Sequence, residues 1–200
     1  MLRLSNRSGS RPLMQAIRAK HPKFTDAVIA DTRMALVFRG EPGDSRLVVL
    51  LQVLRLAWVS DAFLGQVLYR AKARLQALGI PILPSLAHRG AVSFGQVIVG
   101  NPVILHAPVY LPHGQVVIDG LVEIQAGTHI RPWVTIGLRE GHPVGPTIGR
   151  NVKIGTGAKI IGPVTIGDGA TIGANAVVVD DVPARATVAG IPARDLHPSG

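Results

Sequence analysis

Residues 148–178 read IGRNVKIGTGAKIIGPVTIGDGATIGANAVV, and a branched apolar residue returns there at every sixth position. These positions hold Ile148, Ile154, Ile160, Ile166, Ile172 and Val178. The residues between them are mostly Gly, Ala, Asn, Asp and Thr, which are small enough to turn a corner. A period of six is not the 3.6-residue period of a helix, and a short fixed repeat of this kind predicts a parallel β-helix.

The six-residue period begins before this stretch. It relates Ile98, Ile104 and Tyr110 to one another, and then Ile118, Ile124, Ile130 and Ile136. In such a repeat each short strand pairs with the strand one coil away, and we expect the branched side chains to form an interior column. One coil alone buries almost nothing, so only the stack is stable. The sequence therefore predicts a mostly β fold over residues 91–195.

The first half of the chain has a helical period and predicts an α-helical segment over residues 1–90. We expect one helix over about 25–38, a second and more buried one over 47–59, and a third over 61–78 that Asp61 caps. Helical spacing predicts the buried face of the third helix to consist of Leu64, Val67, Leu68, Ala71, Leu75 and Leu78.

A linker is predicted between the two parts of the chain. Pro81, Pro84 and Gly90 interrupt the helical pattern, and the six-residue repeat follows them. We therefore expect two units, a helical segment over 1–90 and a β-helix domain over 91–195.

Composition and charge exclude several classes of protein. The chain has 200 residues, 47% of them hydrophobic, and no cysteine, which excludes disulfides and thiolate nucleophiles. Residues 1–90 hold 14 Lys and Arg against 5 Asp and Glu, a net charge of +9, whereas residues 91–200 hold 7 of each. Because these charges are dispersed among apolar residues, we interpret them as solvated helix faces and expect neither nucleic-acid binding nor membrane association.

No signal sequence or membrane span is predicted. The first residues, MLRLSNR, carry arginines with no apolar run behind them. The longest apolar run, 47–59, is too short to span a bilayer and contains Gln52 and Arg55. We therefore expect a cytoplasmic protein.

The hexads over 118–178 and the closing segment DDVPARATVAGIPAR at 180–194 resemble the hexapeptide-repeat acyltransferases, whose β-helix is left-handed. Within that family the chain is most similar to the serine O-acetyltransferase branch. The resemblance implies a homotrimer that binds acetyl-CoA as co-substrate in a groove between neighbouring subunits. It also implies a histidine that deprotonates the acceptor for direct attack on the thioester. Whether two trimers pair through their helices into a hexamer stays open.

The six-residue repeat breaks twice, and each break contains a histidine. Eight residues separate Tyr110 from Ile118, with His113 between them, and twelve separate Ile136 from Ile148, with His142 between them. The interior of a solenoid has no room for a site, so function belongs on such insertions. Histidine suits a general base because its unperturbed pKa is about 6.5.

Both histidines are candidate catalytic residues, and each has a second interpretation. His113 lies where the serine branch has an eight-residue unit with its catalytic histidine, although that branch reads Asp-His and this chain reads Leu-Pro-His. His142 lies in Gly-His-Pro-Val, similar to a substrate loop of the serine branch and to the base of the galactoside acetyltransferases. Alternatively, His113 is a surface loop residue and His142 fills a hexad position. The acids that are candidates to orient the base are Asp119, Glu123 and Glu140.

For the co-substrate, the resemblance implies three contact residues. Thr156 and Ala174 match positions whose backbone contacts the pantetheine arm, and Arg194 matches a position that meets the nucleotide phosphates. Alternatively, Thr156 and Ala174 are simply small corner residues. Trp133 is a candidate for the acceptor pocket or for a contact between subunits. No histidine pair has the spacing of the zinc-binding β-helix enzymes, so we expect no metal.

Three functions remain open on this basis. The first is CoA-dependent O-acetyl transfer, with serine as the acceptor that the resemblance implies. The second is acetylation of a sugar, a polysaccharide precursor or a natural product, because the carboxylates of the serine branch do not align. The third is a non-catalytic β-helix that acts as an assembly subunit.

Overall fold

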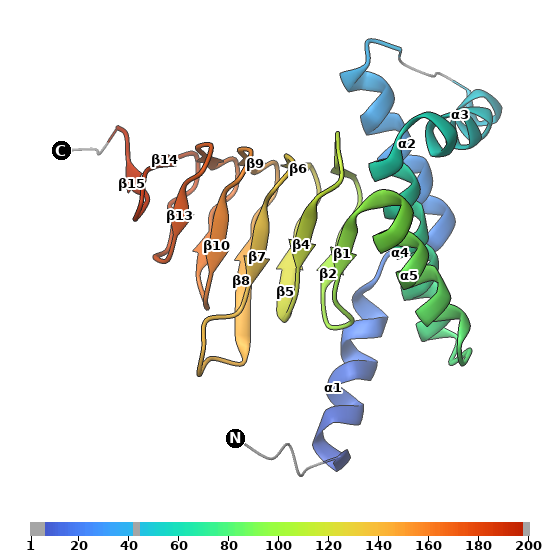
Figure 1. Ribbon diagram of the computed structural model, residues 1–200, viewed down its shortest axis with the longest axis horizontal. Helices are drawn as coiled ribbons and strands as arrows, with labels where there is room; N and C mark the ends of the chain where they lie inside the picture. Colours follow the sequence, from blue (N-terminus) through green and yellow to red (C-terminus); the bar gives the residue numbers. More distant parts are fainter. Residues whose placement is uncertain (1–6, 42–44, 198–200) are drawn as a thin grey trace.

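A layer of helices covers one end of a three-sided β-helix (Figure 1). The structure is a computed structural model that describes residues 7–41 and 45–197. Its helices are α1 (Arg7–Lys20), α2 (Phe24–Phe38), α3 (Arg46–Val59), α4 (Asp61–Ala77) and α5 (Leu83–Gly95).

The β-helix is built from short strands that run in parallel. The strands are β1 (Val97–Val99), β2 (Ile104–Leu105), β3 (Val109–Tyr110), β4 (Val116–Ile118), β5 (Leu121–Ile124), β6 (Thr128–Ile130), β7 (Thr135–Gly137), β8 (Val144–Ile148), β9 (Lys153–Ile154), β10 (Lys159–Ile161), β11 (Thr165–Ile166), β12 (Thr171–Ile172), β13 (Val177–Val178), β14 (Thr187–Ala189) and β15 (Arg194–Asp195). Sheet A has the order β1-β4-β7-β10-β13, sheet B β11-β8-β5-β2 and sheet C β15-β14-β12-β9-β6-β3. Only β15 pairs in an antiparallel way among these strands. The prediction of a parallel β-helix behind N-terminal helices is confirmed.

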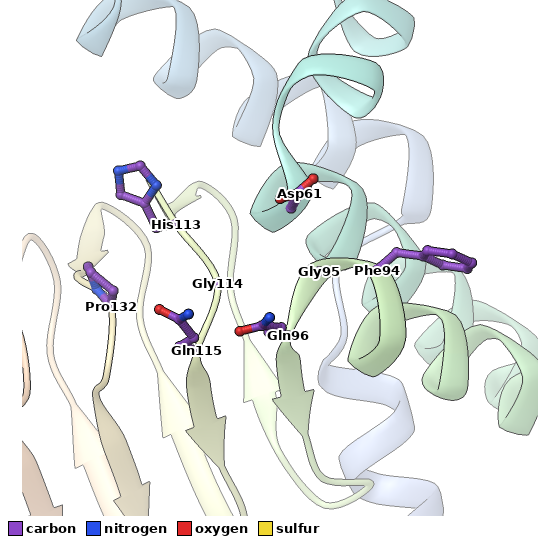
Figure 2. A pocket seen from close by; sticks show the side chains of 8 residues that line it. All are labelled: Asp61, Phe94, Gly95, Gln96, His113, Gly114, Gln115 and Pro132. Atoms are coloured by element: carbon purple, nitrogen blue, oxygen red, sulfur yellow. The ribbon is translucent and has the colours of Figure 1, made fainter.

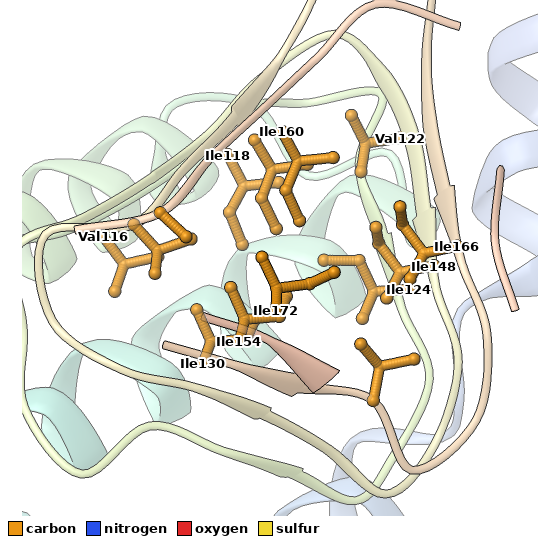
Figure 3. Packing of buried hydrophobic residues seen from close by; sticks show 14 of the residues in the cluster. Val116, Ile118, Val122, Ile124, Ile130, Ile148, Ile154, Ile160, Ile166 and Ile172 are labelled. Atoms are coloured by element: carbon orange, nitrogen blue, oxygen red, sulfur yellow. The ribbon is translucent and has the colours of Figure 1, made fainter. Parts of the chain in front are cut away.

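Branched apolar side chains from all three sheets fill the interior of the β-helix (Figure 3). The stacked isoleucines are Ile118, Ile136 and Ile160 in sheet A, Ile124, Ile148 and Ile166 in sheet B, and Ile130, Ile154 and Ile172 in sheet C. None of them is more than 1% exposed. The interior column predicted from residue 118 onward is confirmed.

The first coil departs from the predicted register by one residue. Ile98 pairs with Val117 on the outer side of sheet A and is 38% exposed, and Tyr110 pairs with His129 on the outer side of sheet C. The residues that fill the interior here are Val97, Val99, Val103, Leu105, Val109 and Leu111. Because side chains alternate along a strand, a shift of one residue exchanges the two faces. The interior positions predicted for Ile98, Ile104 and Tyr110 are therefore wrong.

Helix α4 closes the open end of the β-helix with hydrogen-bond donors. The strands of the first coil have no strand before them, so their outer carbonyl groups need other partners. The donors are Gln66 Nε2 to Val109 O at 2.9 Å, Tyr69 OH to Val103 O at 3.0 Å, Arg70 Nη1 to Leu105 O, and Lys72 Nζ to Val99 O and Gly100 O. The first strand of each sheet thus receives a side-chain donor from α4.

A buried ion pair connects α2 to α4 and to the first coil. Arg70 Nε donates to Asp31 Oδ2 at 3.0 Å, and both side chains are 2% exposed. The second carboxylate oxygen of Asp31 accepts from the backbone N–H of Val109 at 2.9 Å. Burial raises the pKa of Asp31, and the neighbouring Arg70 opposes that rise. Asp31 and Arg70 therefore join α2, α4 and the first coil.

The predicted buried face and cap of α4 are wrong. Leu64, Val67 and Leu68 are only half-buried, because the face turned to the β-helix carries the polar donors described above. The cap is Ser60, whose hydroxyl accepts from the backbone N–H of Phe63 at 3.4 Å, and Asp61 is the first residue of the helix.

Helix α3 is not the more buried helix that its composition predicts. Of its residues, Val49 and Leu56 are buried, whereas Leu54 is 71% and Trp58 90% exposed. The reason is its position at the outer side of the helical layer (Figure 1), where it contacts α2 and α4 through one face.

The predicted linker is also wrong, because α5 occupies that segment. Pro84 lies in the first turn of α5, where a missing N–H is tolerated. Gly90 lies against α4: a Cβ there would come within 3.1 Å of Leu68 Cδ1. The expected boundary at residue 90 therefore falls inside a helix that ends at Gly95.

Within the described ranges, no single helix is both long and apolar enough to cross a membrane.

We expect Asp31→Ala to lower the free energy of unfolding by about 3–5 kcal/mol, because Arg70 would stay buried without its counter-charge. Urea unfolding followed by circular dichroism measures this. Glu41→Ala is the control: it breaks the exposed pair between Glu41 and Arg55, and we expect no measurable change. Equal losses in the two variants would contradict the role given to the buried pair.

Stability should fall in mild acid partly through His21. Burial, with the nearby charges of Arg70 and Lys72, lowers the pKa of His21 to about 4. Between pH 6.5 and 4 the unfolded chain binds a proton there that the folded chain does not, so folding weakens as the pH falls through this window. Urea unfolding of His21→Gln should show a shallower pH dependence than wild type. The exposed His197→Gln variant should keep the wild-type dependence, and a wild-type slope in His21→Gln would refute the assignment.

Candidate active site

The edge between sheets C and A, here called the C–A edge, carries His113. One turn per coil stacks along it, at residues 111–115, 131–134, 155–158, 173–176 and 190–193. Backbone hydrogen bonds connect successive turns, from Trp133 N to Gln115 O, from Gly157 N to Pro132 O and from Asn175 N to Thr156 O. Neighbouring strands are about 4.8 Å apart, so the turn at 173–176 lies roughly 14 Å along the edge from His113.

A pocket of about 220 Å³ lies where the C–A edge meets the helices (Figure 2). It is lined by Asp61, Phe94, Gly95, Gln96, His113, Gly114, Gln115 and Pro132. His113 is exposed to solvent at its rim, and Asp61 lines the pocket from the first turn of α4. The pocket therefore combines an imidazole, a carboxylate and two carboxamides from helix and β-helix.

Three glycines allow the helices to approach the turn that bears His113. A Cβ on Gly95 of α5 would lie 2.6 Å from the Cα of Gly65 in α4. A Cβ on Gly114 would lie 2.1 Å from the carbonyl oxygen of Gly95. Because backbone atoms cannot yield as side chains do, these positions admit only glycine. The resulting backbone contact fixes the position of His113 relative to Asp61.

The corner residues beside the pocket are unusual. On the C–A edge the left-handed corner position is held by Gln96, Gln115, Trp133, Gly157 and Asn175, at φ values between 50° and 75°. Gly and Asn adopt this conformation readily, whereas Gln and Trp are strained there by about 1–2 kcal/mol. The three strained residues are those nearest the helices. Strained residues cluster at functional sites, so the side chains of Gln96, Gln115 and Trp133 are candidates for ligand contact.

None of the acids proposed from the sequence lies beside His113. Glu123 bonds instead to His106 Nε2 and Lys20 Nζ, each at 2.8 Å, and the hydrogen bond from Lys20 lowers the pKa of Glu123. Asp119 and Glu140 lie on the edge between sheets A and B. The carboxylate that does line the pocket, Asp61, is far from His113 in sequence and stands on a helix, so no spacing rule pointed to it.

His142 lies on another edge than His113. Its loop joins β7 of sheet A to β8 of sheet B, and it projects from the body of the β-helix (Figure 1). His142 is exposed, and its Nε2 lies 3.3 Å from Arg139 Nη2. The structure therefore does not bring the two candidate histidines together within one chain.

Two of the three residues expected to contact CoA lie on the C–A edge, and the third, Arg194, follows its last turn. Thr156 lies in its third turn, half-buried, and Ala174 lies exposed in its fourth. Arg194 begins β15 just after the last turn, and its guanidinium contacts Asp180 at 3.2 Å, with both side chains exposed. His113, Thr156 and Ala174 thus share one edge.

Comparison with known proteins identifies the family to which the chain belongs. Residues 145–180 match the family model described as bacterial transferase hexapeptide (six repeats). A serine acetyltransferase of Synechocystis sp. is 38% identical over 178 residues, which are 88% of this chain and 68% of that protein. The chain belongs to the serine acetyltransferase family. The serine acetyltransferase of Mycobacterium tuberculosis is 38% identical over 121 residues, 57% of this chain and 53% of that protein.

Solved structures of serine acetyltransferases share the fold. The soybean enzyme complexed with serine superposes with a TM-score of 0.74 at 26% identity, covering 89% of this chain and 71% of that one. A serine acetyltransferase in complex with CoA gives 0.72 at 25% identity, covering 93% and 75%. The chain spans between about half and two thirds of the length of the curated relatives that it matches first.

Proposed function

We propose that this chain transfers the acetyl group of acetyl-CoA to the hydroxyl group of a small acceptor, with serine as the first candidate. The observation that carries the proposal is the pocket in which an exposed histidine stands at one end of the edge that holds Thr156 and Ala174. Relatives named serine acetyltransferase, and solved structures with serine and with CoA, support the choice of both substrates.

In the proposed reaction His113 acts as general base. It accepts the proton of the acceptor hydroxyl while the hydroxyl oxygen attacks the thioester carbonyl carbon of acetyl-CoA. The new C–O bond forms, the C–S bond breaks, and the proton passes from His113 to the departing thiolate of CoA. The transfer is direct, and the chain contains no cysteine that would form a thioester intermediate.

Asp61 and the two glutamines are proposed to hold the acceptor. A carboxylate on the pocket wall suits the ammonium group of an amino acid, because a charge-assisted hydrogen bond is about twice as strong as a neutral one. The carboxamides of Gln96 and Gln115 can donate to a carboxylate and accept from a hydroxyl. Together with His113 these groups match every polar group of serine.

Along the C–A edge we propose the site of acetyl-CoA. The backbone at Thr156 and Ala174 contacts the pantetheine arm, and Arg194 meets the phosphates. An exposed ion pair contributes little, so Arg194 can exchange Asp180 for a phosphate oxygen at small cost.

A homotrimer is part of the proposal. His113 and His142 lie on different edges of one β-helix, so both reach one site only if a neighbouring subunit supplies the second. The outer side of sheet A, which lies between these edges, carries apolar residues such as Ile98, Val117 and Val177.

A second candidate acceptor is a sugar or natural-product hydroxyl. The observation in its favour is that Asp119, Glu123 and Glu140 all lie away from His113, whose expected Asp-His pair reads Pro-His here. One experiment compares both candidate acceptors.

That experiment follows thiol release from acetyl-CoA with L-serine, homoserine, simple sugars and aminoglycosides. We expect release with one acceptor and expect His113→Ala to lower kcat about 10²–10⁴-fold, the usual contribution of a general base. His197→Ala, a remote exposed histidine, should retain wild-type activity. If His142→Ala removes the activity and His113→Ala keeps it, the base is misassigned. If no acetyl-CoA binding is found by calorimetry, the chain is an assembly protein.

Introducing a large side chain on the C–A edge tests where CoA binds. Ala174 and Ala184 are both exposed alanines in corner turns, but Ala184 lies on the edge between sheets B and C. We expect Ala174→Trp to raise the Kd of CoA at least about tenfold, since a lost contact of 1.4 kcal/mol corresponds to that factor. Ala184→Trp should leave it unchanged. An equal change in the Kd of CoA in the two variants would contradict the proposed CoA site on the C–A edge.

A further inference from the structure

Helix α3 carries an apolar stripe that no described part of the chain covers. The apolar stripe consists of Leu47, Leu50, Leu51, Leu54 and Trp58, with exposed fractions of 69%, 47%, 62%, 71% and 90%. At about 100° per residue these side chains share one face of the helix. The opposite face holds Val49 and Leu56, which are buried. The stripe is therefore a second apolar face on a helix that already packs through its first.

Arginines flank the apolar stripe on both sides. On the helical wheel Arg46 falls on one flank and Arg55 on the other, and both are exposed. Arg55 is paired with Glu41 at 2.5 Å, and Arg46 begins the helix. The described part of α3 has no acidic residue. An apolar face can enter the acyl boundary of a lipid surface while basic side chains at its edges meet the headgroups, and the stripe with Arg46 and Arg55 provides both.

The geometry of the neighbouring helix restricts how α3 can meet lipid. Taken together, α3 and α4 have the length and composition of a membrane span, but they are bent by 116° at Ser60. The buried face of α4 carries Arg70 and Lys72, which bond to the first coil. Since α4 is thereby held inside the protein, α3 can lie on a membrane surface but cannot cross the bilayer with it.

Charge decides between a lipid surface and a second copy of this chain. All of the net charge of +9 lies in residues 1–90, which supply the helical layer that includes α3 (Figure 1). Two copies that met through α3 would bring two such basic layers together, which is electrostatically unfavourable. An anionic bilayer has the opposite sign and takes up the apolar side chains as well. We propose that α3 binds the surface of anionic lipid membranes through its apolar stripe.

The sequence alone predicted no membrane association because it did not show which face of 47–59 is covered. The structure also places the stripe next to the pocket: Asp61 comes three positions after Trp58, at most about 11 Å of chain. Bound α3 would thus hold the mouth of the pocket near the lipid surface. This consequence rests on the function proposed for the pocket, whereas lipid binding does not.

The test is sedimentation of the full chain with phosphatidylcholine vesicles, with and without phosphatidylserine. We expect binding to the vesicles that contain phosphatidylserine, weaker binding at high salt, and at least a tenfold loss of affinity in the double variant Leu54→Ser, Trp58→Ser. Leu86→Ser, an exposed leucine of α5 that is 55% exposed, is the matched control and should bind as wild type. Because all of these side chains are exposed, the variants should fold, which circular dichroism checks.

Fluorescence locates the contact. The chain has two tryptophans, so Trp133→Phe leaves Trp58 as the single reporter, and we expect its emission to shift to the blue with phosphatidylserine vesicles. Equal sedimentation of wild type and the double variant would overturn the proposal. So would an absence of vesicle binding combined with a smaller assembly for the double variant in ultracentrifugation, which would assign the stripe to contacts between copies. Thiol release is measured separately, so failure of lipid binding and failure of the proposed activity are distinguishable.

Discussion

The hydrogen bonds from α4 to the first coil are the interaction on which the rest of the structure depends. A parallel stack can add coils at its far end, but its first coil presents carbonyl groups that no strand can meet. Gln66, Arg70 and Lys72 meet them from one helix face, one at the first strand of each sheet. This requirement also fixes the rotation of α4, which begins directly after the cap residue Ser60. Asp61 therefore reaches the His113 pocket as a consequence of how the β-helix is closed.

The six-residue period predicted the coil well from residue 118 onward and failed before it. Inside the stack each hexad position accepts one branched side chain, so interior and pattern coincide. In the first coil part of the outer face is covered too: Ile104 is 4% exposed, and Tyr110 stacks on Phe38 of α2 at 4.4 Å between ring centroids. Strands buried on both faces lose the alternation that identifies the inner side. Ile98 and Tyr110 match the six-residue period only by coincidence, and the true register of the first coil differs from the predicted one by one residue.

The sequence likewise predicted one part of the candidate site and missed another. The turns bearing His113, Thr156 and Ala174 were predicted because they belong to the repeat or to its breaks, and the repeat itself stacks them on one edge. Asp61 and Gln96 were not predicted, since they come from helix ends that the repeat does not describe. A signal did exist in the corner pattern: the coils near the helices replace Gly and Asn by Gln and Trp at a left-handed position. That exchange is visible only once the register of the coils is known.

Helices α3 and α4 show why hydropathy misjudged burial in this layer. By composition α3 belongs inside and α4 on the surface, yet α4 buries Arg70 and Lys72 while α3 exposes Leu54 and Trp58. What a helix buries depends on the surface it meets, and the end of a β-helix is a polar surface made of carbonyl groups. A polar helix face is therefore the complementary partner there, and its burial is stable because each donor has an acceptor. The same argument applied to α3 requires an apolar partner, and no described segment of the chain provides one for the stripe.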